Sequence, residues 1–147
     1  MMLVRPKLQY ACCTWDPYRH QKDIAALERV QRKAARFVTG NYEQTASVTS
    51  MLSELKWDSL ESLRGRARLT TMYKMCYGML EGNWGSYMIP NRERRTRGSH
   101  YFKFVVPKGN KDVFRFSFFP RTISEWNRLP SDTVLAKTVH SFKKKLT

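Results

Sequence analysis

Apolar residues recur at helical spacing along the first half of the chain. From Gln21 to about Val38 one stripe follows i, i+3, i+4, i+7 spacing, which predicts an amphipathic helix that ends at Gly40. The stripe contains Ile24, Leu27, Val30, Gln31, Ala34, Phe37 and Val38. A short helix after it can be capped by Ser47 or Thr49.

A second long helix is predicted from about Ser59 to Leu80. Asp58 and Glu61 form a capping-box-like start to this helix. From Leu69 onward apolar residues occupy every side of the helix apart from Lys74, which is typical of a helix that is buried on all sides. We therefore expect residues 69–80 to form the central core element.

The pattern changes in the second half, where short apolar runs alternate with turn residues. Tyr101–Val106 predicts a strand and residues 107–110 predict a turn. Val113, Phe114 and Phe116 suit a second strand or an extended approach to the segment that follows. Together these segments predict a β-hairpin.

The segment from 116 to 130 combines four aromatic residues with two prolines. Pro120 fits the first turn of a helix, where a missing N–H group costs nothing. Ile123, Trp126 and Asn127 then share one face, and we expect Ile123 and Trp126 to point toward the core. A last helix is expected near the C-terminus, over residues 138–146.

These patterns predict a mainly α fold in two parts. Residues 1–82 form a helical region, and residues 83–147 form a small C-terminal α+β module that contains the β-hairpin.

Charge is the outlying property of the composition. The chain carries 27 Lys and Arg against 12 Asp and Glu, a net charge of +15, with a pI near 10.1. Such an excess favours a polyanionic partner, that is RNA, DNA or an RNA–DNA hybrid bound through its phosphates. A solvated basic surface is the alternative. Cations project from the 21–38 helix opposite its apolar stripe, and other basic clusters follow. The candidate nucleic-acid-binding residues are Lys22, Arg29, Arg32, Lys33, Arg36, Arg64, Arg66, Arg68, Arg94, Arg95 and Arg97.

Catalytic motifs are lacking in the sequence. There is no Gly-rich phosphate loop, no nucleophile elbow, no zinc-protease helix and no aromatic-x-Asp-Asp hairpin to hold two metal ions. Glu125 stands at helical spacing from Arg121 and Arg128, which makes it an ion-pair partner rather than an acid catalyst. We therefore expect no enzymatic activity, no metal and no cofactor.

The cysteines and histidines are interpreted as structural or surface residues. Three cysteines, two of them adjacent, do not have the spacing of a zinc site and are expected to be buried thiols. The three histidines are scattered among basic residues, so each is expected at the surface.

No segment of the sequence indicates export or membrane insertion. The first ten residues contain Arg5, Pro6 and Lys7, which interrupt any signal-peptide-like run. No apolar run approaches the roughly 18 residues needed to span a bilayer. We therefore expect an intracellular protein with no membrane partner, in either the nucleus or the cytoplasm.

Several stretches resemble one protein family in the same order along the chain. The aromatic-aromatic-Pro-Arg-Thr start and Trp-Asn-x-Leu-Pro end of residues 118–130 resemble the C-terminal segment of jockey-like non-LTR (LINE) retrotransposon reverse transcriptases. Residues 3–11 with Trp15-Asp-Pro17 are similar to the start of their thumb region. Residues 27–37 resemble the thumb helix, and residues 59–74 also fit the family pattern.

The resemblance implies a thumb-like helical bundle over 1–82 followed by the post-thumb module. The parent family is an RNA-directed DNA polymerase, but nothing in this sequence resembles its endonuclease, fingers or catalytic palm. A non-catalytic fragment that grips template–primer duplex through its backbone is therefore the first expectation. One alternative is a protein-interaction module that docks on the missing polymerase portion. Another is a decayed element copy without selected function.

Overall fold

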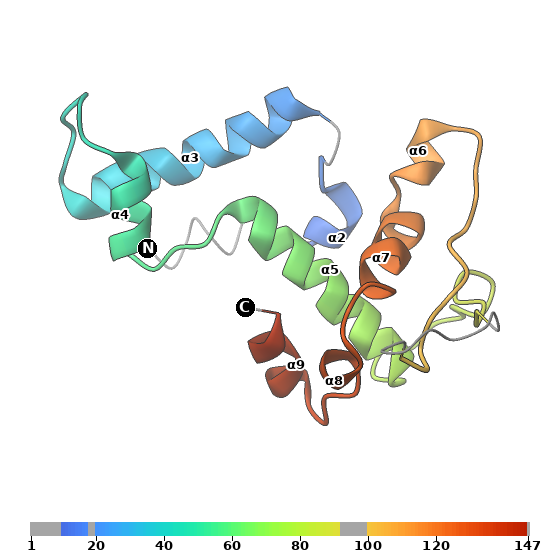
Figure 1. Cartoon of the computed structure of the whole chain (residues 1–147). Coiled ribbons are helices and arrows are strands. Elements are labelled where there is room, and N and C mark those ends of the chain that lie inside the picture. The colour runs from blue at the N-terminus through green and yellow to red at the C-terminus, as the bar shows by residue number, and fades with distance from the viewer. Residues whose placement is uncertain (1–9, 18–19, 92–99, 147) are drawn as a thin grey trace. The chain divides into compact units, whose positions relative to one another are not determined.

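The computed structural model describes residues 10–17, 20–91 and 100–146, and within them it is mainly α-helical, as predicted (Figure 1). The chain divides into two compact units, Met1–Gly65 and Arg66–Thr147. The helices are α2 (Cys12–Trp15), α3 (Gln21–Thr39), α4 (Val48–Glu54), α5 (Leu60–Cys76), α6 (Asp112–Arg115), α7 (Phe118–Trp126), α8 (Ser131–Val134) and α9 (Val139–Lys145).

Helix α3 has the predicted bounds because strong local signals mark both its course and its end. It stops at Gly40, whose φ of 65° is the left-handed conformation that glycine adopts without steric cost. The short α4 packs against α3 (Figure 1). Ser47 caps α4 by accepting a hydrogen bond from the Ser50 N–H at 3.3 Å.

Helix α5 starts near the predicted position and ends earlier than predicted. Ser59, rather than Asp58, supplies the cap: its Oγ accepts from the Ser62 N–H at 3.1 Å. Gly78, with a φ of 65°, ends the helix in a Schellman motif. In this motif the Gly78 N–H donates to the Met75 carbonyl at 3.2 Å and the Met79 N–H to the Lys74 carbonyl at 2.8 Å.

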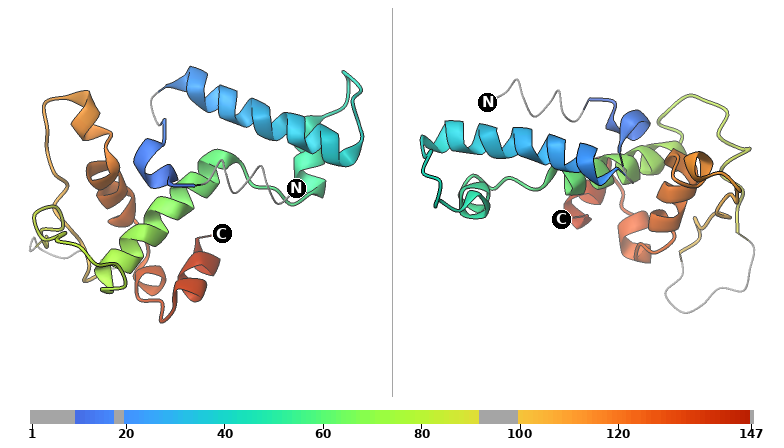
Figure 2. Two further views of the ribbon diagram at one scale, coloured as in Figure 1. Left: turned by 180° about the vertical axis from the view of Figure 1, so that it is seen from behind. Right: turned by 90° about the horizontal axis from the view of Figure 1, so that it is seen from above.

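The second half of α5 belongs to the core of the C-terminal unit. Met72 and Tyr73 are fully buried, as predicted for this stretch, and belong to one core cluster with residues of α7, α8 and α9. Figure 2 shows the ribbons of α5 and of these helices from two further sides. Beyond the end of α5, Tyr77, Met79 and Leu80 are exposed. The unit boundary lies inside α5, whereas the sequence pattern divides the chain at 82/83, because residues 69–76 find their packing partners downstream.

Helix α7 confirms the prediction for the motif at 116–130. Pro120 lies in its first turn, and Ile123 and Trp126 are fully buried. The Tyr73 and Phe142 rings stack with centroids 4.5 Å apart, and the Trp126 and Phe142 centroids are 5.9 Å apart. Tyr73, Trp126 and Phe142 therefore belong to the core of this unit.

The predicted β-hairpin is wrong in the part of the chain that the structure describes. Residues 112–115 form helix α6 instead of a second strand, and the ladder is reduced to one isolated bridge between Pro90 and Phe104. The Asn91 N–H donates to the Lys103 carbonyl and the Val105 N–H to the Ile89 carbonyl, both at 2.8 Å. These bonds occupy one edge of the extended segment.

Two side chains of the motif occupy the other edge. Trp126 Nε1 donates to the Phe102 carbonyl at 2.7 Å. The Asn127 amide donates to the Phe104 carbonyl at 2.7 Å and accepts from the Phe104 N–H at 3.1 Å. Because residues i and i+2 present their backbone groups on the same edge of a strand, these three bonds leave no room there for a second strand.

Candidate nucleic-acid interface

Five basic side chains lie on one side of helix α3. At about 100° per residue, they fall within an arc of about 100° around the helix axis. Four of them are exposed and Arg36 is half-buried. We call this surface the α3 cationic face; it consists of Lys22, Arg29, Arg32, Lys33 and Arg36.

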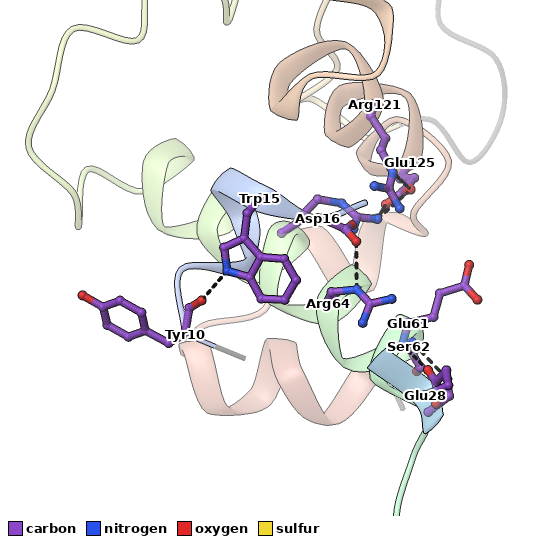
Figure 3. Close-up of polar contacts among 11 residues, drawn as sticks. Tyr10, Trp15, Asp16, Glu28, Glu61, Ser62, Arg64, Arg121 and Glu125 are labelled. Carbon is purple, nitrogen blue, oxygen red and sulfur yellow. Dashed lines mark hydrogen bonds and ion pairs between the residues drawn. The ribbon is translucent and has the colours of Figure 1, made fainter. Parts of the chain in front are cut away.

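The two carboxylates of α3 lie outside this arc. Glu28 turns toward the start of α5, where its Oε1 accepts a hydrogen bond from the Glu61 N–H at 3.3 Å (Figure 3). Gln31, on the same buried side, donates to the Asp58 carbonyl at 2.9 Å. Glu28 is therefore engaged at the start of α5, and five cations against two carboxylates outside their arc leave an excess of positive charge on the cationic face.

Arg36 has a structural task in addition to its charge. Its Nη1 donates to the Glu43 carbonyl at 2.7 Å, and the Glu43 N–H in turn donates to Asn41 Oδ1 at 3.1 Å. These contacts fix the loop after α3 against the last turn of the helix. Arg36 is therefore the least suitable member of the face for a test by charge reversal.

Arg64 and Arg68 do not belong to an exposed basic surface, contrary to the prediction. Their exposed fractions are 1% and 3%. Arg64 Nε pairs with Asp16 Oδ1 at 2.8 Å in the N-terminal unit (Figure 3). In the C-terminal unit, Arg68 Nη2 donates to both carboxylate oxygens of Glu125 at 3.0 Å. Both guanidinium groups neutralise buried or half-buried carboxylates, so they are removed from the candidate interface.

The structure describes only one of the four remaining predicted site residues, Arg66. Arg66 is half-buried in the middle of α5. Arg94, Arg95 and Arg97 lie outside the described residues. The α3 cationic face is therefore the part of the candidate site that the structure brings together.

Glu125 has the ion-pair role that its spacing predicts, together with a partner that the spacing does not reveal. Its Oε1 lies 3.5 Å from Arg121 Nε, one helical turn away (Figure 3). The second partner, Arg68, is 57 residues away in sequence. The carboxylate is thereby held between two guanidinium groups.

The thiols are also structural. Burial raises the pKa of Cys12 to about 11 and the pKa of Cys76 to about 12. Both thiols stay protonated near neutral pH and are weak nucleophiles. Cys12 is buried as predicted, whereas Cys13 and Cys76 are only half-buried. Among the described residues, no group of three or more His, Cys, Asp or Glu side chains could hold a metal ion.

His100 is buried, contrary to the prediction that all three histidines lie at the surface. Its exposed fraction is 2%, whereas His20 and His140 are exposed. Its Nε2 lies 3.2 Å from the Trp126 carbonyl, while Nδ1 has no hydrogen-bond partner among the described residues. Burial lowers the pKa of His100 below its ordinary value of 6.5, an effect that the carbonyl contact opposes and Lys103 reinforces.

Acid should therefore destabilise the C-terminal unit through His100. The folded chain disfavours protonated His100. The stability that neutral His100 contributes is therefore fully present above pH 6.5 and is lost as the pH falls through the lowered pKa of the folded chain. The urea midpoint of wild type should fall between a pH above 6.5 and a pH below it. We expect this fall to be smaller in His100→Gln. His140→Gln, at an exposed position, is the control and should keep the full wild-type fall. An equal fall in all three proteins would contradict this role.

Exposed apolar side chains on α3 are the feature that the sequence pattern did not predict. Of the helix residues, only Gln31 and Ala35 are fully buried. Val30, Phe37 and Val38, which the pattern assigns to the apolar stripe, have exposed fractions of 43%, 75% and 44%. Periodicity identifies the apolar side of a helix but does not tell how much of that side another element covers.

Comparisons of this chain with protein-family models, curated proteins and solved structures found no match. Among the described residues, no helix combines the length and apolar character that a membrane crossing requires.

Proposed function

We propose that this chain is a non-catalytic module that holds the sugar–phosphate backbone of a template–primer duplex on the α3 cationic face. Its parentage, a thumb and post-thumb region of a jockey-like non-LTR retrotransposon reverse transcriptase, is part of the proposal. The observation that supports the binding role most directly is the one-sided arrangement of α3: five cations share an arc of about 100°, and both carboxylates of the helix lie outside it.

The residue types of the face suit backbone contacts rather than base recognition. Arg and Lys neutralise phosphates and release condensed counterions, which makes the affinity fall with salt. Such contacts position a protein on a duplex without reading its sequence. We therefore propose binding to RNA–DNA hybrid or DNA duplex with little sequence preference.

The motif rings do not favour the docking alternative. Trp126 is fully buried, and Phe119 stacks on Tyr87 with ring centroids 4.4 Å apart. Phe118 lies edge-to-face against Phe119, with centroids 5.2 Å apart. These rings are engaged within their own unit, so they offer little surface to a polymerase body.

Charge reversal on α3 tests the proposed function. We expect the variant Arg29→Glu/Arg32→Glu/Lys33→Glu to bind an RNA–DNA hybrid about 100-fold more weakly than wild type at low salt. The slope of log affinity against log salt should fall by about 3, or about 1 for each lost phosphate contact. Arg36 is left in place because it fixes the following loop. Fluorescence anisotropy across a salt series measures both quantities.

A matched control separates the α3 face from total charge. The variant Lys108→Glu/Lys137→Glu/Lys144→Glu makes the same change in net charge at three exposed positions of the C-terminal unit. It should keep most of the wild-type affinity. An equal loss in both variants would show unspecific attraction to a basic protein, and salt-insensitive binding by wild type would contradict phosphate contacts.

A further inference from the structure

Two aromatic rings are exposed at the C-terminal end of α3, beside the cationic face. Phe37 has an exposed fraction of 75% and Tyr42 one of 64%. Phe37 follows Lys33 by four residues, so the two side chains are neighbours on the helix surface. Exposed apolar surface that is rimmed by polar or charged residues marks binding sites.

The loop that carries Tyr42 is held against the helix. Gly40 turns the chain in the left-handed conformation, and the Arg36–Glu43 hydrogen bond at 2.7 Å closes the loop one residue after Tyr42. Thr39 Oγ1 donates to the Ala35 carbonyl at 3.0 Å and holds the last turn. Tyr42 therefore stays close to the end of α3 without being packed into the core.

We propose that Phe37 and Tyr42 form a stacking platform for unpaired bases of a polynucleotide whose backbone lies along the α3 cationic face. Interleaved rings and cations are the features that single-stranded nucleic acid requires, because the rings stack on bases while the cations contact phosphates. The basic residues beside Phe37 match this polyanion. The inference rests on the proposed function and refines its substrate to a duplex with a single-stranded extension.

Three probes separate base stacking from phosphate attraction. The first is a blunt RNA–DNA hybrid, and the second is the same hybrid with an extension of about six thymidines, within the reach of one single-strand site. The third carries an abasic extension with the same number of phosphates. Wild type should bind the thymidine probe about tenfold more tightly than the blunt hybrid, and the abasic probe should give little of this gain.

Removal of the rings should abolish that preference and leave the duplex contacts intact. We expect Phe37→Ala/Tyr42→Ala to bind the blunt hybrid with wild-type affinity and salt dependence, but to lose the tenfold gain from thymidines. Both rings are largely exposed, so the variant should keep the wild-type helical circular dichroism. Tyr10→Ala, which removes a ring with an exposed fraction of 80% elsewhere in the same unit, should keep the gain.

The possible failures are distinguishable. If wild type binds all three probes equally well, the platform is overturned and the proposed duplex binding stands. If the double variant keeps the thymidine gain, the rings have another occupant, such as an apolar protein segment, and the platform is again overturned. If wild type binds none of the probes, the proposed function fails and the platform fails with it.

Discussion

Replacing Trp126 with alanine is expected to lower the free energy of unfolding by about 3–5 kcal/mol, a large part of the stability of a small domain. The indole is fully buried and packs with Phe142 in the core of the C-terminal unit. The variant loses this packing, leaves a cavity and deprives the Phe102 carbonyl of the Nε1 donor at 2.7 Å. Urea unfolding followed by circular dichroism measures the loss.

Two controls separate the contributions of the ring. Trp126→Phe keeps much of the packing but removes the Nε1 donor. It should therefore lower the free energy of unfolding by about 1–3 kcal/mol, which is less than the loss for alanine. Trp15→Ala makes the same truncation at a residue with an exposed fraction of 39% and should cost only about 1 kcal/mol. A loss at Trp126 no larger than at Trp15 would contradict the central position of the indole in the core.

The elements that the sequence predicts best are those whose signals are local. Helix α3 follows an unbroken 3.6-residue period and stops at a glycine, so both bounds can be obtained without knowledge of tertiary contacts. The same holds for α7, where Pro120 sets the first turn and the spacing of Ile123 and Trp126 gives the buried face. The early end of α5 also had a local signal, Gly78, which the apolar run beyond it obscured.

The missing hairpin shows where local patterns stop being informative. Residues 101–106 have strand-like composition and are extended at 104, but their backbone groups pair with the side chains of Trp126 and Asn127. Propensity scales score a residue from its own type and its near neighbours, so they carry no information on Trp126 and Asn127, which lie 24 and 23 residues from the backbone groups that they bind. The same composition therefore fits a strand in a hairpin and an extended segment that makes one isolated bridge on one edge and binds side chains on the other.

The basic site was predicted in part for a related reason. Exposed Arg29 and buried Arg64 both lie on helices with neighbouring cations, and the sequence around them gives similar signals. What distinguishes them is a carboxylate from a distant segment: Asp16 for Arg64, and Glu125 for Arg68. A cluster of basic residues in the sequence therefore predicts an exposed cationic surface only where no carboxylate from a distant segment pairs with those residues in the fold.

The Asp16–Arg64 ion pair provides the second large effect on stability. Asp16→Ala is expected to lower the free energy of unfolding by about 3–5 kcal/mol, because Arg64 stays charged with an exposed fraction of only 1% and loses its carboxylate at 2.8 Å. Arg64→Met removes the buried cation and leaves the Asp16 carboxylate, whose side chain is only 7% exposed, without this cation. The variant should therefore also be destabilised. Urea unfolding of both variants gives two sides of a double-mutant cycle.

The double variant Asp16→Ala/Arg64→Met decides what the pair contributes. Desolvation of two charges costs nearly as much as their attraction returns, so replacement of both by apolar groups should restore most of the stability that either single change removes. The coupling free energy from the cycle should therefore be at least about 2 kcal/mol. Arg115→Met at the exposed Asp112–Arg115 pair, 3.6 Å apart, is the control and should change stability by less than about 1 kcal/mol. Additive losses at 16 and 64 would mean that the two side chains stabilise the N-terminal unit independently, and that burial of Arg64 does not depend on Asp16.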